Sequence, residues 1–185
     1  LDQLQGTIIL RGRFPKIVNL NVVTGEKLTI LSESSFTKVS DIYVQSKGRL
    51  DIEGKVFKTL KTVTNNGELI VRGKRGELSS EIVIPVSSES FVINGIYKGE
   101  AGSILQLENG VKISANNWDN RGKILSRNGI KINQSGGSVT KWGDIESGGN
   151  IDYEITGVDV GLDNSFINPK TKETLRIFSN RNVTI

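Results

Sequence analysis

Apolar residues recur along the chain in short runs of three to five, and Gly, Asn or Ser separates one run from the next. Many of these runs alternate with polar residues. Alternation with a period of two predicts β-strands, and no stretch shows the 3.6-residue period of an amphipathic helix. The 21 glycines against 3 prolines fit many tight turns. We therefore predict an all-β chain built from many short strands.

Two pairs of segments repeat with the same spacing. Gly48–Lys55 resembles Gly67–Lys74, and Glu108–Ile113 resembles Arg127–Ile132, in both cases at an offset of 19 residues. A period near 20 is too short for a propeller blade, and the leucine pattern of leucine-rich repeats is missing. The period predicts a right-handed parallel β-helix, a solenoid with about 19–21 residues per coil.

Stacking of these repeats gives sensible neighbours on successive coils, about 4.8 Å apart. Apolar residues meet apolar ones in the interior, and several outward pairs have opposite charges, which stabilise stacked strands. The apolar pairs are Leu50 over Leu69, Ile52 over Val71, Val111 over Ile130 and Ile113 over Ile132. The charged pairs are Arg49 with Glu68, Glu53 with Arg72 and Glu108 with Arg127, whereas Lys55 with Lys74 and Lys112 with Lys131 are like-charged.

Asn-Gly pairs recur at the expected corners, as in Asn66-Gly67, Asn109-Gly110 and Asn128-Gly129. Glycine there is expected to adopt positive φ, a region that asparagine also tolerates. Asn109 and Asn128 are expected to stack as an amide ladder.

Three segments lack the repeat: 1–45, 81–101 and 156–185. We predict them to be loop or hairpin excursions from one continuous β-helix domain, 1–185. Irregular segments are where binding functions are most often located.

Two of these segments have the pattern of a β-hairpin. Asn19–Val23 and Lys27–Leu31 flank a Thr-Gly-Glu turn, and 165–167 and 174–178 flank an Asn-Pro-Lys-Thr turn. We expect an antiparallel pair at each place.

The composition excludes several classes of enzyme mechanism. The chain has no cysteine and no histidine, which removes disulfides, thiolate metal sites, the cysteine nucleophile and the commonest general base. We predict no enzymatic activity and no cofactor. The absence of methionine, also at position 1, predicts that the chain is a fragment of a longer protein.

Charge and hydropathy limit the kinds of partner that the chain is expected to have. The net charge of +4 is spread along the chain without a basic segment of nucleic-acid strength, so we predict no nucleic-acid partner. No apolar run is long enough to span a bilayer, so we predict no membrane insertion by this segment.

Four groups of residues are candidates for chemistry, each with a plainer alternative. Paired carboxylates on adjacent coils would suit a glycosidase, but an acidic solvated strand has the same sequence pattern. Aromatics recurring once per coil could stack on sugars or fill the core. The acidic group is Asp144, Glu146, Asp152 and Glu154, and the aromatic group is Trp118, Trp142 and Tyr153.

The other two groups are charged surface segments. Asp159–Ser165 offers oxygen ligands for calcium but does not follow the twelve-residue loop pattern, so an acidic turn is the alternative. A basic group could meet an anionic surface, although Glu53, Glu68 and Glu77 interleave with it. This basic group is Lys55, Lys58, Lys61, Arg72, Lys74 and Arg75.

The 19-residue period and the Asn-x-Gly phrasing of Asn120–Ile124 and Asn65–Leu69 resemble the repeats of filamentous haemagglutinin-type exoproteins over residues 45–80 and 104–155. That family includes adhesins and contact-dependent growth inhibition effectors exported by two-partner secretion. The resemblance implies a β-helical filament at the bacterial cell surface, extracellular, with irregular sections that bind receptors.

Three functions remain open. The first is a segment that binds a cell-surface receptor on a bacterial or host cell, an outer-membrane protein or a glycan, through residues that the sequence does not single out. The second is a polysaccharide-cleaving or glycan-binding β-helix of the lyase or phage tailspike kind. The third is an inert filament spacer.

Overall fold

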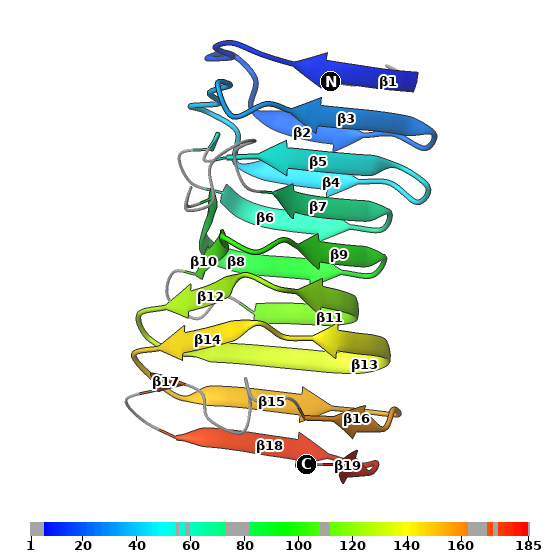
Figure 1. Ribbon diagram of the computed structural model, residues 1–185, viewed down its shortest axis with the longest axis vertical. Helices are drawn as coiled ribbons and strands as arrows, with labels where there is room; N and C mark the ends of the chain where they lie inside the picture. The colour runs from blue at the N-terminus through cyan, green and yellow to red at the C-terminus, as the bar shows by residue number, and fades with distance from the viewer. Residues whose placement is uncertain are drawn as a thin grey trace.

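The structure is a computed structural model, and the statements below concern the part of the chain that it describes. Those residues are 6–54, 56–57, 60–72, 82–107, 112–162, 170–171 and 174–184. They contain strands and turns and no helix. Parallel strands stack as a β-solenoid of about seven turns (Figure 1). The predicted all-β parallel solenoid is confirmed.

The strands of successive coils form three surfaces, which we name A, B and C. Surface A holds β1 (Gly6–Leu10), β3 (Glu26–Ile30), β5 (Arg49–Glu53), β7 (Glu68–Arg72), β9 (Ile96–Gly99) and the second halves of β11 (Lys112–Asn120) and β13 (Ile130–Lys141). Surface B holds β2 (Asn19–Val22), β4 (Asp41–Val44), β6 (Leu60–Asn65), the second half of β8 (Ile82–Ile93), the first halves of β11 and β13, β15 (Ile151–Ile155) and β18 (Leu175–Ser179).

Surface C is a sheet only in the C-terminal part. It holds the first half of β8, β10 (Ser103–Leu107), β12 (Lys123–Ser126), β14 (Asp144–Ser147) and β17 (Lys170–Thr171). Two short strands, β16 (Val160–Gly161) and β19 (Val183–Thr184), pair separately. Strands of surface A lie in front and run leftward in Figure 1, those of surface B run rightward behind, and the chain descends, so the winding is right-handed.

Coil length varies while the register between coils is kept. Arg49 pairs with Glu68 nineteen residues later, and Ile151 pairs with Leu175 twenty-four residues later. The coil between Glu68 and Ile96 takes twenty-eight residues, so extra chain is accommodated there without loss of register. The hydrogen-bonded register therefore tolerates insertions at the corners.

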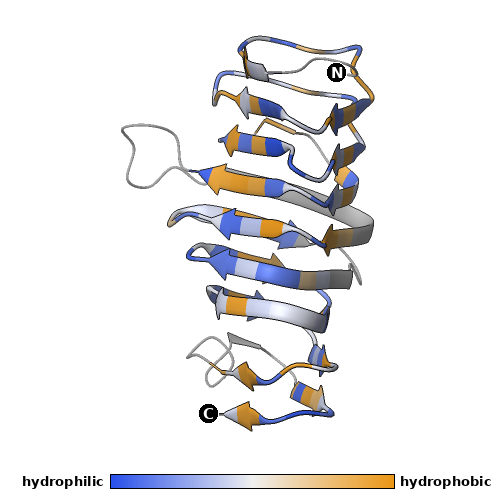
Figure 2. Ribbon diagram, turned by 90° about the vertical axis from the view of Figure 1, so that its right-hand side faces the viewer, coloured by the Kyte–Doolittle hydropathy of each residue, from blue (hydrophilic) through white to orange (hydrophobic). Residues whose placement is uncertain are grey.

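Hydrophobic and hydrophilic residues alternate along many strands (Figure 2), and in β2, β3, β4 and β15 buried positions alternate with more exposed ones. Two buried apolar columns run through successive coils: Leu28, Leu50 and Leu69 form one, and Ile30, Ile52 and Val71 form the next. The predicted stacks of Leu50 over Leu69 and Ile52 over Val71 are confirmed. Burial of each such side chain contributes about 1.5–3 kcal/mol. Stacked apolar columns thus supply the core.

The other predicted stacks divide into two groups. Arg49 with Glu68, Glu53 with Arg72, Ile113 with Ile132 and Lys112 with Lys131 are register partners, as predicted. The remaining predicted stacks involve Lys55, Lys74, Glu108 and Val111, which lie outside the described residues.

The Asn-x-Gly phrase has a physical explanation in the structure. The buried Asn65 amide accepts from the Gly67 nitrogen through Oδ1 at 3.1 Å and donates through Nδ2 to the Ile96 carbonyl of the next coil at 2.7 Å. Asn120 does the same with Gly122 at 3.0 Å and Trp142 at 2.9 Å. Each asparagine therefore fixes its own turn and ties it to the following coil.

The glycine of this phrase is needed for space rather than for positive φ. A Cβ on Gly67 would lie 2.2 Å from the Gly48 carbonyl oxygen, and one on Gly122 would lie 2.3 Å from the Ser103 carbonyl oxygen. Positive φ was the wrong reason for Gly67, although Gly129 does adopt it, with φ of 117°. The predicted Asn109–Asn128 ladder includes a residue outside the described part.

The hairpin predicted at Asn19–Leu31 is wrong. Strand β2 pairs in parallel with β4, whereas β3 pairs in parallel with β1 and β5, so the Thr24-Gly25 turn joins surface B to surface A. A tight turn between alternating strands looks the same in both arrangements, because the local sequence does not specify the pairing partner.

The three segments without a sequence repeat still contribute strands to the solenoid. Residues 6–45 supply β1 to β4, and 82–99 supply β8 and β9. In the last segment β18 pairs in parallel with β15, and the other strand of the hairpin predicted there, residues 165–167, lies outside the described part. Coil stacking therefore extends beyond the repeats that the sequence displays.

Candidate functional site

The aromatic residues singled out in the sequence fill the interior. Trp118, Trp142 and Tyr153 are at most 2% exposed. Trp118 stacks on Tyr97 with ring centroids 4.2 Å apart, and Trp142 lies 5.2 Å from both Trp118 and Tyr153. Burial also raises the pKa of the Tyr97 hydroxyl. Of the two interpretations, the core is confirmed and a sugar-stacking role for these rings is wrong.

The acidic group does not form a carboxylate pair on adjacent coils. Asp144 and Glu146 lie on surface C, and Asp152 and Glu154 lie on surface B of the same coil, because the chain turns a corner between β14 and β15. Asp152 accepts two hydrogen bonds from Arg176, at 2.7 and 2.9 Å. The two halves of the group therefore face different directions.

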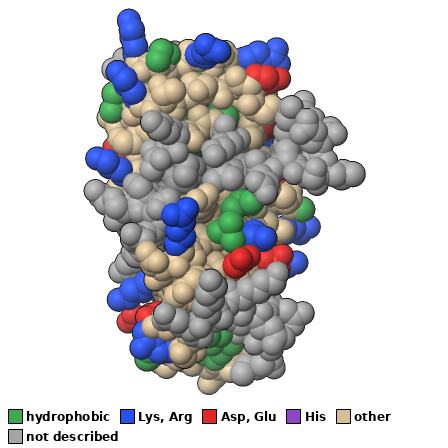
Figure 3. Space-filling model, turned by 90° about the vertical axis from the view of Figure 1, so that its left-hand side faces the viewer, with side chains coloured by type: hydrophobic (Ala, Val, Ile, Leu, Met, Phe, Trp, Pro, Cys, Tyr) green, Lys and Arg blue, Asp and Glu red, His purple; other side chains and the backbone are tan. Residues whose placement is uncertain are grey.

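The predicted basic group is also divided between surfaces. Lys61 lies on β6 of surface B, Arg72 lies on surface A, and the other four basic residues lie outside the described part. On the face that holds surface C, acidic and basic side chains occur in small separate groups (Figure 3). Among the side chains of described residues on this face, no single-sign patch is visible.

The predicted calcium segment is only partly described. The Asp159 carboxylate accepts a hydrogen bond from the Asn182 nitrogen at 3.1 Å, and residues 163–165 lie outside the described part. Within the described ranges, no three His, Cys, Asp or Glu residues are grouped as a metal site requires.

Surface A carries a ladder of ion pairs. Asp51, 5% exposed, accepts from Arg49 at 2.8 and 3.2 Å and from Arg72 at 3.3 Å, and Arg72 also donates to Glu100 at 2.9 Å. The hydrogen bond to Asp51 raises the pKa of Arg49. Arg49, Asp51 and Arg72 line a concavity of about 780 Å³, but they bind one another. The ladder therefore stabilises the stack of coils rather than presenting free charge.

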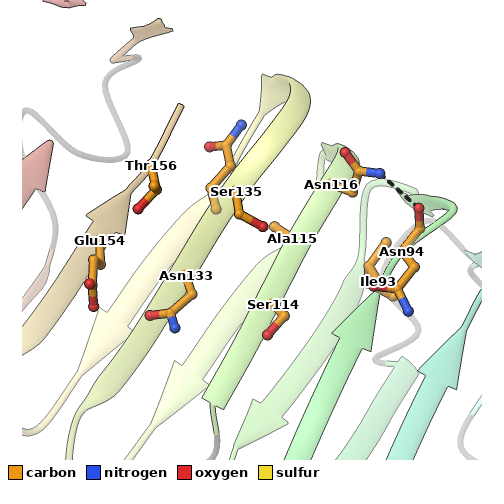
Figure 4. Close-up of a pocket in the computed structure, with 10 residues that line it drawn as sticks. Ile93, Asn94, Ser114, Ala115, Asn116, Asn133, Ser135, Glu154 and Thr156 are labelled. Carbon is orange, nitrogen blue, oxygen red and sulfur yellow. Dashed lines mark hydrogen bonds between the residues drawn. The ribbon is translucent and has the colours of Figure 1, made fainter. Parts of the chain in front are cut away.

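Surface B carries a polar groove of about 460 Å³ over β8, β11, β13 and β15. Its side chains form two rows across the strands (Figure 4). The first row is Ser114, Asn133 and Glu154, which are register partners on successive coils. The second row is Asn94, Asn116, Ser135 and Thr156. We call this feature the surface B groove.

An amide ladder builds one wall of the groove. Asn116 donates through Nδ2 to the Asn94 carbonyl at 2.8 Å, and Asn94 donates through Nδ2 to the Asn66 side chain at 2.7 Å. Asn66 in turn donates to the Tyr43 hydroxyl at 2.9 Å. Backbone and amide bonds between coils thus hold these side chains in fixed positions.

The floor of the groove is formed where the register between β11 and β13 is irregular. The pairing of β11 with β13 shifts between Ala115 and Asn117, where both strands bend from surface B to surface A. Ala115 is 5% exposed and Gln134 is 2% exposed, and the Tyr153 hydroxyl donates to the Gln134 side chain from below. Such bulges are common beside functional sites because they redirect side chains.

The groove offers hydrogen-bonding groups that the protein itself leaves unused. Within the described residues, the exposed Glu154 carboxylate makes no hydrogen bond or ion pair, and neither do the hydroxyls of Ser114 and Ser135. Phe178, 54% exposed, is the register partner of Glu154 on the next coil. The arrangement can bind a ligand rich in hydroxyl groups.

Sequence reasoning missed this groove. Its serines, threonine and asparagines have the composition of ordinary solvated strands and turns, and only the stacking of coils brings them together. The one usable signal was Glu154, which was singled out but as half of a carboxylate pair.

Comparisons with protein-family models, with curated proteins and with solved structures gave no match. What is shown is the β-solenoid fold itself. In the described part of the chain, no helix has the length and apolarity required to cross a membrane.

Proposed function

We propose that this chain is a β-helical segment of a filamentous haemagglutinin-type exoprotein that binds a receptor on a target cell. The protein would be exported by two-partner secretion and act outside the cell, at the bacterial surface, in adhesion or contact-dependent growth inhibition. The receptor would be an outer-membrane protein or a surface glycan. The repeat phrase and the solenoid fold support the assignment to this kind of protein.

One observation carries the binding role. The surface B groove presents a carboxylate and several hydroxyls that make no bond within the described residues, beside the amide ladder of Asn116, Asn94 and Asn66. On surface A, by contrast, Asp51, Arg72 and Glu100 are bound to one another. A spacer has no need of a preformed groove with unused polar groups, since exposed strands are solvated equally well without one.

The test is binding of the purified protein to intact Gram-negative cells. Wild-type cells are compared with mutants that lack major outer-membrane proteins or outer lipopolysaccharide sugars. We expect saturable binding that is lost in one mutant and weakened by Glu154→Gln. Glu146→Gln is the matched control, because Glu146 lies on the same coil but on surface C. Folded protein that binds none of the cells would contradict the proposal and leave the spacer.

A polysaccharide-cleaving role gains no support from the carboxylates. Glu154 shares the groove with amides and hydroxyls, and among the described residues no second acidic side chain lines it. Two carboxylates flanking one bond are the usual requirement for glycoside hydrolysis. We therefore infer binding without turnover, with no nucleic-acid partner and no membrane insertion by this segment.

A further inference from the structure

The surface B groove repeats its chemistry once per coil. Ser114, Asn133 and Glu154 are register partners on three successive coils, and each projects a small polar group outward. Successive coils lie about 4.8 Å apart. That distance is close to the length of one pyranose unit in an extended polysaccharide. A sugar chain laid along the solenoid axis would meet an equivalent polar group at every unit.

The row of Ser114, Asn133 and Glu154 continues on the next coil with an aromatic side chain, Phe178. Phe178 follows Glu154 in register, and its side chain is 54% exposed on a strand whose neighbours are polar. Exposed aromatic rings beside hydrogen-bonding groups suit sugars, because a pyranose ring has an apolar face and hydroxyl edges. Phe178 would stack under one sugar while Glu154 accepts from the hydroxyls of the unit before it.

The charge of the groove restricts the ligand. Among the described residues that line the groove, Glu154 is the one ionisable side chain, and an anionic sugar would face a carboxylate that has no partner there. Lys131 and Arg176 lie in the neighbouring column, where both are register partners of Asp152 and Arg176 hydrogen-bonds it. The groove therefore disfavours uronic, sialylated and sulfated chains.

From these three observations, and resting on the function proposed above, we propose that the surface B groove binds an uncharged, extended oligosaccharide along the solenoid axis, with about one sugar per coil. Phe178 provides the stacking platform. Glu154 accepts hydroxyl hydrogens, and Ser114 and Asn133 contact the units farther along the chain.

The experiment is titration calorimetry of the purified protein with cellohexaose, chitohexaose and mannohexaose as uncharged probes and hexagalacturonate as the anionic probe. We expect at least one uncharged hexamer to bind, and hexagalacturonate to bind at least tenfold more weakly. Phe178→Ala should weaken the binding by about tenfold, the size of one aromatic contact. Glu154→Gln should weaken it by about fivefold through the loss of charge-assisted hydrogen bonds.

Two variants serve as matched controls. Ile9→Ala removes an equally exposed apolar side chain from surface A, and Glu146→Gln removes a carboxylate from surface C. Both should bind as the wild type does, and all four variants should unfold at the wild-type temperature. Equal losses in a control and in its partner variant would overturn the groove as the site.

Ligand length gives an independent measurement. The row from Ser114 to Phe178 spans four coils, so affinity should rise from dimer to about tetramer and then level off. Affinity that is independent of length would overturn the axial placement.

The outcomes separate the ligand class from the proposed function. Binding to cells without binding to any uncharged hexamer would overturn this inference and leave the proposed function standing. Sugar binding without cell binding would support the inference and contradict the proposed function. Tighter binding of hexagalacturonate than of every uncharged hexamer would overturn the inference.

Discussion

The ion-pair ladder of surface A and the groove of surface B lie on two faces of one solenoid, yet their polar side chains are paired to different extents. On surface A, long charged side chains reach across coils and bind one another, as Arg72 does with Asp51 and Glu100. In the groove of surface B, short serine and asparagine side chains leave the Glu154 carboxylate without a partner among the described residues. The comparison shows that the charged side chains of the ladder bind one another, whereas the less charged groove keeps polar groups available for a ligand.

The physical reason is the length of the side chains relative to the spacing between coils. Stacked coils are about 4.8 Å apart, a distance that an arginine spans and a serine does not. Arginines can therefore pair between coils on both surfaces, as Arg72 does with Asp51 and Arg176 with Asp152, whereas the short hydroxyl side chains of the groove make no such bond within the described residues. A ligand can then make the bonds that the protein does not.

The largest change is expected at the turn that joins the two surfaces. In Gly67→Ala, the new Cβ would lie 2.2 Å from the Gly48 carbonyl oxygen, so the coils must move apart. We expect a loss of roughly 3 kcal/mol in the free energy of unfolding, measured by urea denaturation. Gly161→Ala is the control, since nothing lies within 4 Å of its Cβ position. Similar losses in both variants would contradict close packing of the turn.

Removal of Asp51, the carboxylate that Arg49 and Arg72 share, should cause the second-largest loss of stability. Asp51→Ala leaves Arg49 and Arg72 without their common partner, and both arginines are 32% exposed, so water compensates in part. We expect a loss of about 2 kcal/mol, also by urea denaturation. If Asp51→Ala costs no more than Glu146→Ala on surface C, the ladder does not stabilise the stack.

A smaller, pH-dependent effect is expected on surface B. Hydrogen bonds from Ser40 and Thr62 hold the pKa of Asp41 below its ordinary value of 3.8. The stabilisation from this lowered pKa is complete above pH 3.8 and is lost as pH falls through the folded-state pKa. Asp41→Asn should cost about 1 kcal/mol at pH 6 and progressively less below pH 4.

The comparison is made by thermal unfolding of both proteins over that pH range. Asp144→Asn on surface C, where the side chain is exposed, should show no such trend. A constant difference between Asp41→Asn and the wild type from pH 6 to pH 2 would be at odds with the hydrogen bonds.

The smallest effect on stability is expected in the groove. Glu154→Ala removes an exposed carboxylate that makes no bond within the described residues, so the free energy of unfolding should change by less than about 0.5 kcal/mol. Calorimetry measures this directly. A loss as large as that of Asp51→Ala would show that Glu154 belongs to the scaffold, and the contrast between the two surfaces would fail.

The repeats predicted the fold and part of its register. Two segments at an offset of 19 placed Leu50 over Leu69 and Arg49 beside Glu68, because identical strands stack with identical positions aligned. Where the sequence does not repeat, as around Thr24-Gly25, a local turn signal suggested a hairpin. Strand alternation has the same period in both arrangements, so it could not reveal that β2 and β3 pair with other coils.

The sequence by itself determined that the chain is all-β, that it winds with about 20 residues per coil, and that it lacks the residues for thiol or imidazole chemistry. Only the tertiary structure decided which polar side chains have partners. Burial of Trp118 and exposure of Phe178 both depend on which face of a strand points inward. The surface B groove exists because residues about twenty positions apart are brought side by side by hydrogen bonds between coils.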